Sequence, residues 1–210
     1  MGNFRTKARA IELLGRKQIR DSVTALAELM KNSYDADAPW LRVEFDVGTK
    51  AEHIIIADSG IGMTSSDIQE KWLVLGTNSK TNSKGKTSPG GRILMGAKGI
   101  GRLASARLGK QLWMFTKSAK SLWNIVYINW NLFENPYLAL EDIQIPVMYG
   151  ISADRLAEQF ETVKSELLTL QKKNLELEGW FQPFGEDIAF NRDNMIKEEL
   201  TSLYKETQKS

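Results

Sequence analysis

The sequence predicts an α+β domain followed by a helical segment. Three observations support this class: a long helical pattern opens the chain, short apolar runs with strand periodicity follow it, and the last part of the chain is helical again. With 210 residues the chain is long enough for one domain of ordinary size and an appendage. We therefore place the domain at residues 1–150 and the helical segment at residues 151–210.

The first element is helical and the next two are strands. Residues 6–37 have the composition of a helix, with a break expected near Gly15. Residues 40–47 alternate apolar and polar side chains, as a half-buried strand does. Residues 53–60 are a β-branched run that ends in a turn, which predicts a central strand.

A helix, a loop and a second helix are expected next. Thr64 and Asp67 have the spacing of a helix cap, so residues 64–76 are predicted to be helical. Residues 78–91 are rich in Ser, Thr, Gly and Lys, which predicts a mobile loop. Residues 98–109 are predicted to form a helix that begins among glycines and ends at Gly109.

The last elements are a hairpin and two accessory helices. Residues 111–116 and 121–130 are predicted to be strands of one hairpin. Residues 151–178 form a long helical pattern capped by Ser152, and a final helix is expected from about Asp193. The apolar spacing does not sustain three clean heptads, so these helices are not expected to form a coiled coil.

Composition excludes several classes of protein and site. The chain has no cysteine and a single histidine, His53, which excludes disulfides, cysteine-ligated metals and sites built on paired histidines. Hydrophobic residues make up 42% and charged residues 26%, as in an ordinary globular domain. Because no long apolar run and no signal core occur, we expect no membrane span and a cytoplasmic protein.

Positive charge is concentrated in one stretch of the chain. The formal net charge is +2, but residues 1–150 carry +6 and residues 151–210 carry −4. Residues 76–110 hold eight basic side chains and no acidic one. Such a stretch indicates an anionic partner, either phosphate or nucleic acid.

Three polar side chains of the first helical pattern are predicted to share one face. Glu28, Asn32 and Asp35 are separated by four and three residues, and a helix returns to the same face at these intervals. A small residue, Ala36, follows them. This stretch alone leaves two interpretations open: a solvated face that runs into a turn, or polar groups directed into a shared pocket.

Glycines follow the second predicted strand in "ADSGIGM". Asp58 ends the strand, and Gly60, Gly62 and Met63 come after it. Glycines permit positive φ and a close approach of the backbone to a flat ligand. A buried carboxylate there can accept a hydrogen bond from an exocyclic amine, and the methionine can pack on a ring. The alternative is a simple strand-to-helix turn with an aspartate cap.

A second group of glycines opens a predicted helix in "GAKGIGR". Gly96, Gly99 and Gly101 present backbone N–H groups there, and Lys98 and Arg102 add positive charge. Both the N–H groups and the helix dipole favour a phosphate at such a place. The order of the glycines differs from the dinucleotide-binding G-x-G-x-x-G, and no P-loop Lys-Ser/Thr pair follows them.

Taken in order, these blocks resemble the GHKL ATPase superfamily. A helix with Glu-x3-Asn-x2-Asp-Ala precedes Asp-x-Gly-x-Gly after a strand, then a basic loop, then Gly-x2-Gly-x-Gly at a helix start. The superfamily comprises the DNA gyrase B subunit, the ninety-kilodalton heat-shock chaperone, MutL and MORC proteins and sensor histidine kinases. The resemblance covers residues 20–131. It implies the Bergerat fold, a two-layer α/β sandwich in which helices cover one face of a mixed sheet.

The resemblance also implies roles for single residues. Glu28 matches the general base that activates the attacking water, and Asn32 matches the Mg²⁺ ligand. Asp35 matches a second acid beside the nucleotide, and Asp58 matches the aspartate that reads adenine. Residues 78–101 match the ATP lid. The other expected nucleotide-binding residues are Ala36, Gly60, Gly62, Met63, Gly76, Thr77, Lys80, Gly96, Lys98, Gly99, Ile100, Gly101, Arg102 and Thr116.

The branch of the superfamily is indicated by Glu28. Sensor histidine kinases share the asparagine and glycine motifs but lack this glutamate, and they need a phosphoacceptor histidine. The only histidine, His53, falls at the start of the strand that leads to Asp58. The sequence departs from the pattern of the ATPase members in two ways. No Gly-Thr strand is seen after Ile128, and no second α/β domain follows.

The expected function is Mg²⁺-dependent ATP binding with slow hydrolysis, in which lid closure acts as a conformational switch. The alternative is a nucleotide-dependent module that binds protein or DNA and hydrolyses little ATP. The expected partners are ATP, a second copy in an ATP-dependent homodimer, a protein bound through residues 151–210, and DNA.

Overall fold

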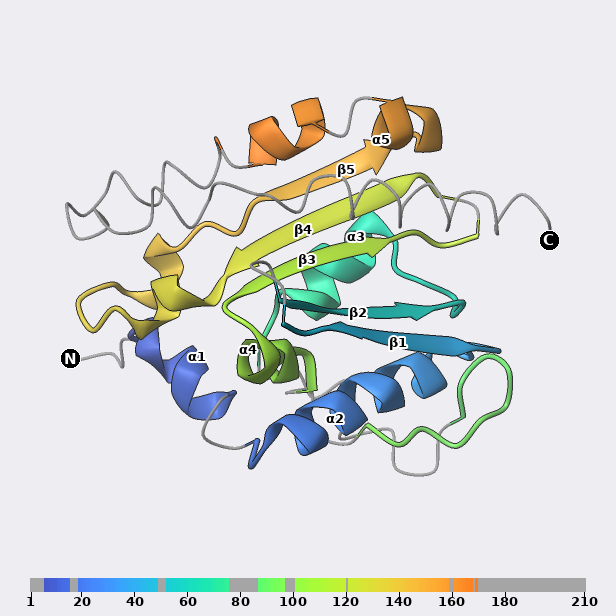
Figure 1. Cartoon of the computed structure of the whole chain (residues 1–210), viewed down its shortest axis with the longest axis horizontal. Helices are drawn as coiled ribbons and strands as arrows, with labels where there is room; N and C mark the ends of the chain where they lie inside the picture. The colour runs from blue at the N-terminus through green and yellow to red at the C-terminus, as the bar shows by residue number, and fades with distance from the viewer. Residues whose placement is uncertain are drawn as a thin grey trace, which may run out of the picture.

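Two antiparallel sheets form the framework of the chain (Figure 1). The computed structural model describes residues 6–15, 19–48, 52–75, 87–96, 101–119, 121–158, 161–167 and 169. The first sheet pairs β1 (Leu41–Asp46) with β2 (His53–Asp58). The second has the order β3 (Gln111–Thr116), β4 (Trp123–Asn129), β5 (Val147–Ile151).

The strand pairing differs from the expected mixed sheet. Among the described residues all three pairings are antiparallel. β1 and β2, like β3 and β4, are joined by short connections, which suit hairpins, whereas parallel neighbours need a longer crossover. The predicted hairpin is confirmed, with Gln111 opposite Asn129 and Thr116 opposite Asn124. β5 was not expected; this strand after Ile128 ends in Gly150-Ile151 rather than Gly-Thr.

The helical pattern at the start of the chain forms two helices. α1 (Arg9–Leu14) ends at Gly15, which confirms the expected break. α2 (Ser22–Asp35) begins after Asp21, whose carboxylate accepts the Thr24 N–H at 2.7 Å. That bond satisfies one of the N–H groups that a helix start leaves without a partner.

The helical segment after β2 begins with a capping box. α3 (Ser65–Asp67) continues as a π-helix, η1 (Ile68–Trp72). The Thr64 hydroxyl accepts the Asp67 N–H at 3.2 Å, and the Asp67 carboxylate accepts the Thr64 N–H at 3.0 Å. The cap predicted from the sequence is therefore confirmed.

The helix expected after the second glycine group is short. It consists of a 3₁₀ turn, η3 (Gly101–Ala104), followed by α4 (Ser105–Leu108), and it ends at Gly109 as predicted. α2 packs across both pieces, and Ala25 and Ala104 are fully buried at the contact. These small side chains let the two helical segments approach closely, so the start of η3 lies beside α2.

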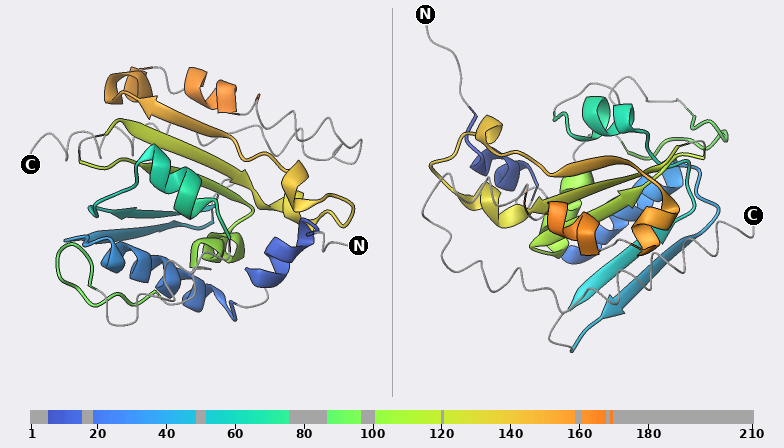
Figure 2. Two further views of the ribbon diagram at one scale, coloured as in Figure 1. Left: turned by 180° about the vertical axis from the view of Figure 1, so that it is seen from behind. Right: turned by 90° about the horizontal axis from the view of Figure 1, so that it is seen from above.

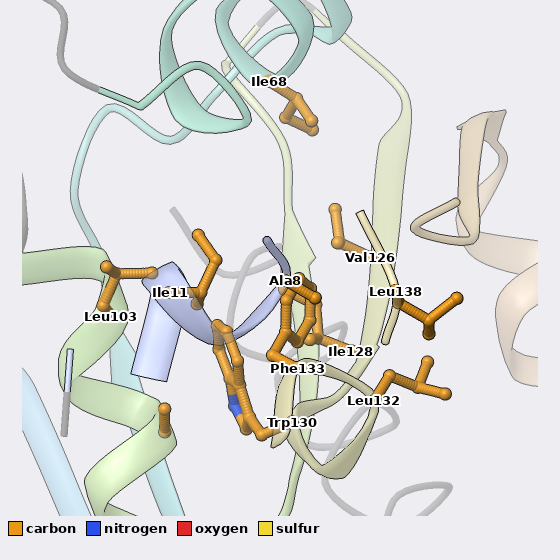
Figure 3. Close-up of a cluster of buried hydrophobic side chains, with 11 residues drawn as sticks. Ala8, Ile11, Ile68, Leu103, Val126, Ile128, Trp130, Leu132, Phe133 and Leu138 are labelled. Carbon is orange, nitrogen blue, oxygen red and sulfur yellow. The ribbon is translucent and has the colours of Figure 1, made fainter. Parts of the chain in front are cut away.

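Apolar side chains cover both faces of the three-stranded sheet, and the expected two-layer sandwich stays a prediction. On one face Val126 and Ile128 pack in a cluster with Ile11 of α1, Ile68 of η1 and Leu103 of η3 (Figure 3). The period of two along β4 places Ile125, the residue before Val126, on the opposite face. There it packs with the three apolar residues Leu156, Val163 and Leu167.

The second face is covered by the segment that follows β5. α5 (Ala153–Glu158) begins after Ser152, whose hydroxyl accepts the Arg155 N–H at 3.1 Å, so the predicted cap is confirmed. Residues 161–167 are also helical. α5 lies at the β5 side of the molecule and α2 at the β1 side (Figures 1 and 2).

Two further 3₁₀ turns lie within the described residues, η4 (Trp130–Glu134) and η5 (Leu140–Asp142). The final helix expected from about Asp193 falls outside the described residues. None of the helices within the described ranges is long and apolar enough to cross a membrane.

Candidate functional site

The polar stripe predicted on α2 faces the start of η3. A methyl group added at Gly101 would lie 3.5 Å from Oε2 of Glu28 and 3.6 Å from both side-chain polar atoms of Asn32. The Lys31 ammonium donates to Oε1 of Glu28 at 2.8 Å, a partner that the sequence did not indicate. The structure therefore brings Gly101 close to Glu28 and Asn32, which share a face of α2 as their spacing predicted.

Asp58 is joined to α2 by a serine that sequence reasoning missed. The Ser33 hydroxyl donates to Oδ2 of Asp58 at 2.7 Å, and the Gly60 N–H donates to Oδ1 at 2.9 Å. Ser33 is buried, but Asp58 is exposed, so the expected burial of this carboxylate is wrong. Because each carboxylate oxygen has two lone pairs, Asp58 retains capacity to accept a hydrogen bond from a ligand.

Gly60 makes a close approach to the end of α2. A methyl group added there would lie 2.8 Å from both Cβ and the carbonyl oxygen of Ala36. The same carbonyl accepts the Ile61 N–H at 2.8 Å. A residue without a side chain is therefore needed at this point, and Ala36 forms the wall beside Asp58.

The turn after β2 is also fixed to the end of β3. Gly62 has φ +63°, and an added Cβ would lie 1.8 Å from the carbonyl oxygen of Lys117. The Met63 N–H donates to Oγ1 of Thr116 at 3.0 Å, and Nδ2 of Asn124 donates to the Met63 carbonyl at 3.2 Å. The Thr116 hydroxyl therefore holds the glycine turn against the sheet, and its contact with a nucleotide stays a prediction.

Asp35 is the last residue of α2 and accepts two main-chain hydrogen bonds. Its Oδ1 accepts the Met95 N–H at 2.7 Å and its Oδ2 accepts the Gly96 N–H at 3.0 Å. Gly96 is the first residue of the second glycine group, and Gly101, its last glycine, faces Glu28. The first and last glycines of this group thus both lie beside α2, Gly96 at Asp35 and Gly101 at Glu28 and Asn32.

Arg102 makes main-chain contacts that the sequence did not indicate, and its expected contact with a phosphate stays a prediction. Its guanidinium donates to the carbonyls of Lys71, Trp72 and Val74, the last at 3.0 Å. Burial lowers the pKa of this guanidinium from its usual value. These carbonyls lie at the end of η1 and just after it, where a helix leaves acceptors without partners. Arg102 therefore acts in this structure as a cap of η1.

The other expected nucleotide-binding residues lie outside the part of the chain that the structure describes. They are Gly76, Thr77, Lys80, Lys98, Gly99 and Ile100. In the part of the chain that is described, no group of three or more His, Cys, Asp or Glu side chains could hold a metal ion. Asn32 offers a neutral oxygen of the kind that Mg²⁺ accepts, and Mg²⁺ commonly takes few protein ligands together with phosphates and water.

Comparison with known proteins links this arrangement to one family. A family model described as "Histidine kinase-, DNA gyrase B-, and HSP90-like ATPase" matches residues 20–162. The putative type II restriction enzyme HgiDII of Herpetosiphon aurantiacus is 39% identical over 77 residues, 37% of this chain. MORC family CW-type zinc finger protein 3 of Mus musculus is 27% identical over 128 residues, 60% of this chain. The chain spans 12% of the length of either relative.

Proposed function

Because the chain belongs to the family of histidine kinase-, DNA gyrase B- and HSP90-like ATPases, we propose that it binds ATP with Mg²⁺ and hydrolyses it slowly. The observation that carries this proposal is the arrangement on α2. Glu28 and Asn32 face Gly101, and the neighbouring Asp35 holds Gly96, so the two ends of the glycine group flank one polar face.

The residues around Asp58 fit an adenine ring. Ser33 and Gly60 orient the carboxylate, which is exposed and can accept the exocyclic amine. Gly62 and Met63, held by Thr116, form the adjoining wall. The exposed position of Asp58 is consistent with a group that meets its partner only when a ligand is bound.

The polar face of α2 fits the phosphate end of the nucleotide. ATP supplies the phosphoryl group, and Mg²⁺ offsets its negative charge when bound. Asn32 would hold the metal through its amide oxygen. Glu28 would orient a water and accept its proton, and Lys31 keeps the glutamate in position through the 2.8 Å hydrogen bond.

We expect the nucleotide to act as a switch for a macromolecular partner. Lid closure, an ATP-dependent homodimer and a protein partner for residues 151–210 are parts of this proposal. One relative is named as a putative type II restriction enzyme, and residues 76–110 carry eight basic side chains without an acidic one. DNA is therefore the first partner to test, and binding should weaken steeply as salt rises.

The test of nucleotide hydrolysis compares Glu28→Gln with the unmodified chain. We expect both to bind a non-hydrolysable ATP analogue in the presence of Mg²⁺, whereas turnover falls about 100-fold or more in the variant, because a general base typically supplies that factor. Glu44→Gln is the matched control, since Glu44 lies on β1 and pairs with Arg42 at 3.1 Å. Equal turnover in Glu28→Gln would contradict the role of Glu28, and lack of analogue binding by the unmodified chain would contradict the function.

A further inference from the structure

Residues 87–96 are docked on the end of α2 and run beside its C-terminal half (Figures 1 and 2). Asp35 holds one end of this segment through the N–H groups of residues 95–96. Asp37 holds the other end: its Oδ1 accepts the Ser88 hydroxyl and its Oδ2 accepts the Gly90 N–H at 2.7 Å. These two hydrogen bonds keep the pKa of Asp37 below its usual value.

The backbone at Asp37 is shaped for this contact. Among the described residues, Asp37 is the one non-glycine residue with a positive φ, +59°. That conformation costs free energy for a residue with a side chain and persists only where the surroundings impose it. On the facing side, a methyl group added at Gly90 would lie 2.7 Å from Oδ1 of Asp37. The left-handed backbone at Asp37 and the lack of a side chain at Gly90 therefore both allow this close contact.

Arg92 fixes the same segment from a second direction. Its Nη1 donates to the carbonyls of Tyr34 and Ala38 at 3.3 and 3.0 Å, and the guanidinium lies 5.1 Å from the centre of the Tyr34 ring. The negative end of the helix dipole also stabilises a cation in this position. The Arg92 N–H donates to the Ser88 hydroxyl at 2.9 Å, which closes residues 88–92 into a compact turn.

We propose that Asp35, Asp37 and Arg92 form an anchor that sets the position of Gly96 relative to Glu28 and Asn32. They are positioning residues, because the contacts described above join them to groups of the chain itself. The anchor gives Asp35 a main-chain role in place of the nucleotide contact that the family resemblance implies. This inference rests on the proposed function, since the segment that begins at Gly96 is the proposed phosphate-binding segment.

The anchor is tested first without nucleotide, by amide hydrogen exchange. Asp37→Gly removes both acceptors while glycine keeps the left-handed backbone at no steric cost. We expect exchange at the amides of residues 88, 90–92 and 95–96 to rise at least about tenfold, because hydrogen bonds to a charged group are lost. Exchange in β4 should not change. The control is Asp142→Asn. Asp142 also accepts a backbone N–H, from Ala139, and the substitution weakens that hydrogen bond at a place far from the anchor in sequence.

Two further variants separate the anchor from a general loss of structure. Asp37→Asn keeps one oxygen acceptor and tolerates positive φ, so exchange should lie between those of the unmodified chain and Asp37→Gly. Gly90→Ala leaves every carboxylate in place but introduces the 2.7 Å clash with Asp37. It should reproduce the rise in exchange. Unchanged exchange in both Asp37→Gly and Gly90→Ala would overturn the anchor.

The positioning role is then tested with two ligands. A non-hydrolysable ATP analogue uses both the adenine and the phosphate regions, whereas adenosine uses the first alone. We expect Asp37→Gly to weaken analogue binding about tenfold and adenosine binding by less than about twofold. An unchanged ratio of the two affinities would overturn the positioning role. If the unmodified chain binds no analogue, the proposed function and this role both fail, whereas the exchange result still decides whether the anchor exists.

Discussion

The three-stranded sheet and the region around α2 are held together by different interactions. In the sheet, alternate side chains of β4 enter two apolar clusters, one on each face. Around α2, side-chain oxygens and N–H groups join elements distant in sequence, as in Ser33 to Asp58 and Asp35 to Gly96, and glycines permit close approach. Variants in the sheet should therefore change stability, and variants around α2 should change ligand affinity.

The largest effect on stability is expected in the sheet, from Ile125→Ala. Ile125 is fully buried, and removal of its side chain leaves a cavity. We expect the free energy of unfolding to fall by about 4 kcal/mol, within the range for such substitutions. Urea denaturation measures the loss. Leu122→Ala is the control, because Leu122 is 53% exposed.

Ile125→Ala also tests whether the two regions are independent. We expect the folded variant to bind a non-hydrolysable ATP analogue with an affinity within about twofold of that of the unmodified chain. The reason is that the described residues that pack with Ile125 lie on the three-stranded sheet, on α5 and at residues 163–167, and none of them belongs to α2. A large drop in affinity for the folded variant would show that the sheet core also sets the geometry of the site.

Gly62→Ala should affect both properties, because Gly62 lies where the two regions meet. The added Cβ would fall 1.8 Å from the Lys117 carbonyl oxygen and would also impose a left-handed alanine. Steric overlap and backbone strain together should cost about 3 kcal/mol in free energy of unfolding. Analogue binding should weaken as well, since Met63 and Thr116 would move apart.

The control for this substitution is Gly48→Ala. Gly48 has φ +87°, but nothing lies within 4 Å of an added Cβ. Its cost should be that of the backbone alone, about 1 kcal/mol. Equal losses of stability in Gly48→Ala and Gly62→Ala would mean that the contact with Lys117 adds nothing.

The sequence predicted the features that depend on local spacing. The cap formed by Thr64 and Asp67, the stripe of Glu28 and Asn32, and the hairpin of β3 and β4 each follow from a period or a short motif. The family match over residues 20–162 also agrees with the resemblance that the ordered motifs indicated.

The features that escaped prediction depend on partners far apart in the chain. Ser33 meets Asp58 across 25 residues, and Asp37 meets Ser88 across 51. A hydroxyl or carboxylate in a sequence carries no sign of which distant group it will contact. Arg102 illustrates the same limit, since its charge gave no sign that the carbonyls of Trp72 and Val74, about 30 residues away in sequence, accept its hydrogen bonds. β5 was missed because its five residues include a glycine.

A pH titration tests whether a polar contact also contributes to stability. Hydrogen bonds from Lys71 and Thr64 lower the pKa of Asp67 from 3.8 to about 2. A carboxyl whose pKa is lowered by folding stabilises the protein above its unfolded pKa, and this contribution is lost as the pH falls to about 2. Because Asp67 is only partly buried, solvent screening keeps this contribution between about 1 and 2 kcal/mol. The difference in unfolding free energy between the unmodified chain and Asp67→Asn should be largest near pH 6 and should shrink below about pH 4. A difference that does not vary with pH would contradict this assignment.

The smallest change in stability, with a specific loss of affinity, is expected for Ser33→Ala. Loss of the hydroxyl leaves Oδ2 of Asp58 exposed to water, so the unfolding free energy should fall by only about 1 kcal/mol. Without Ser33 the carboxylate is less well oriented, and adenosine should bind about tenfold more weakly. Inosine, which lacks the exocyclic amine, should lose less affinity. Ser105→Ala is the matched control, because Ser105 is also a buried helical serine but donates to the Arg102 carbonyl at 3.1 Å. If both serine variants lower adenosine affinity equally, the contact between Ser33 and Asp58 has no special part in reading the base.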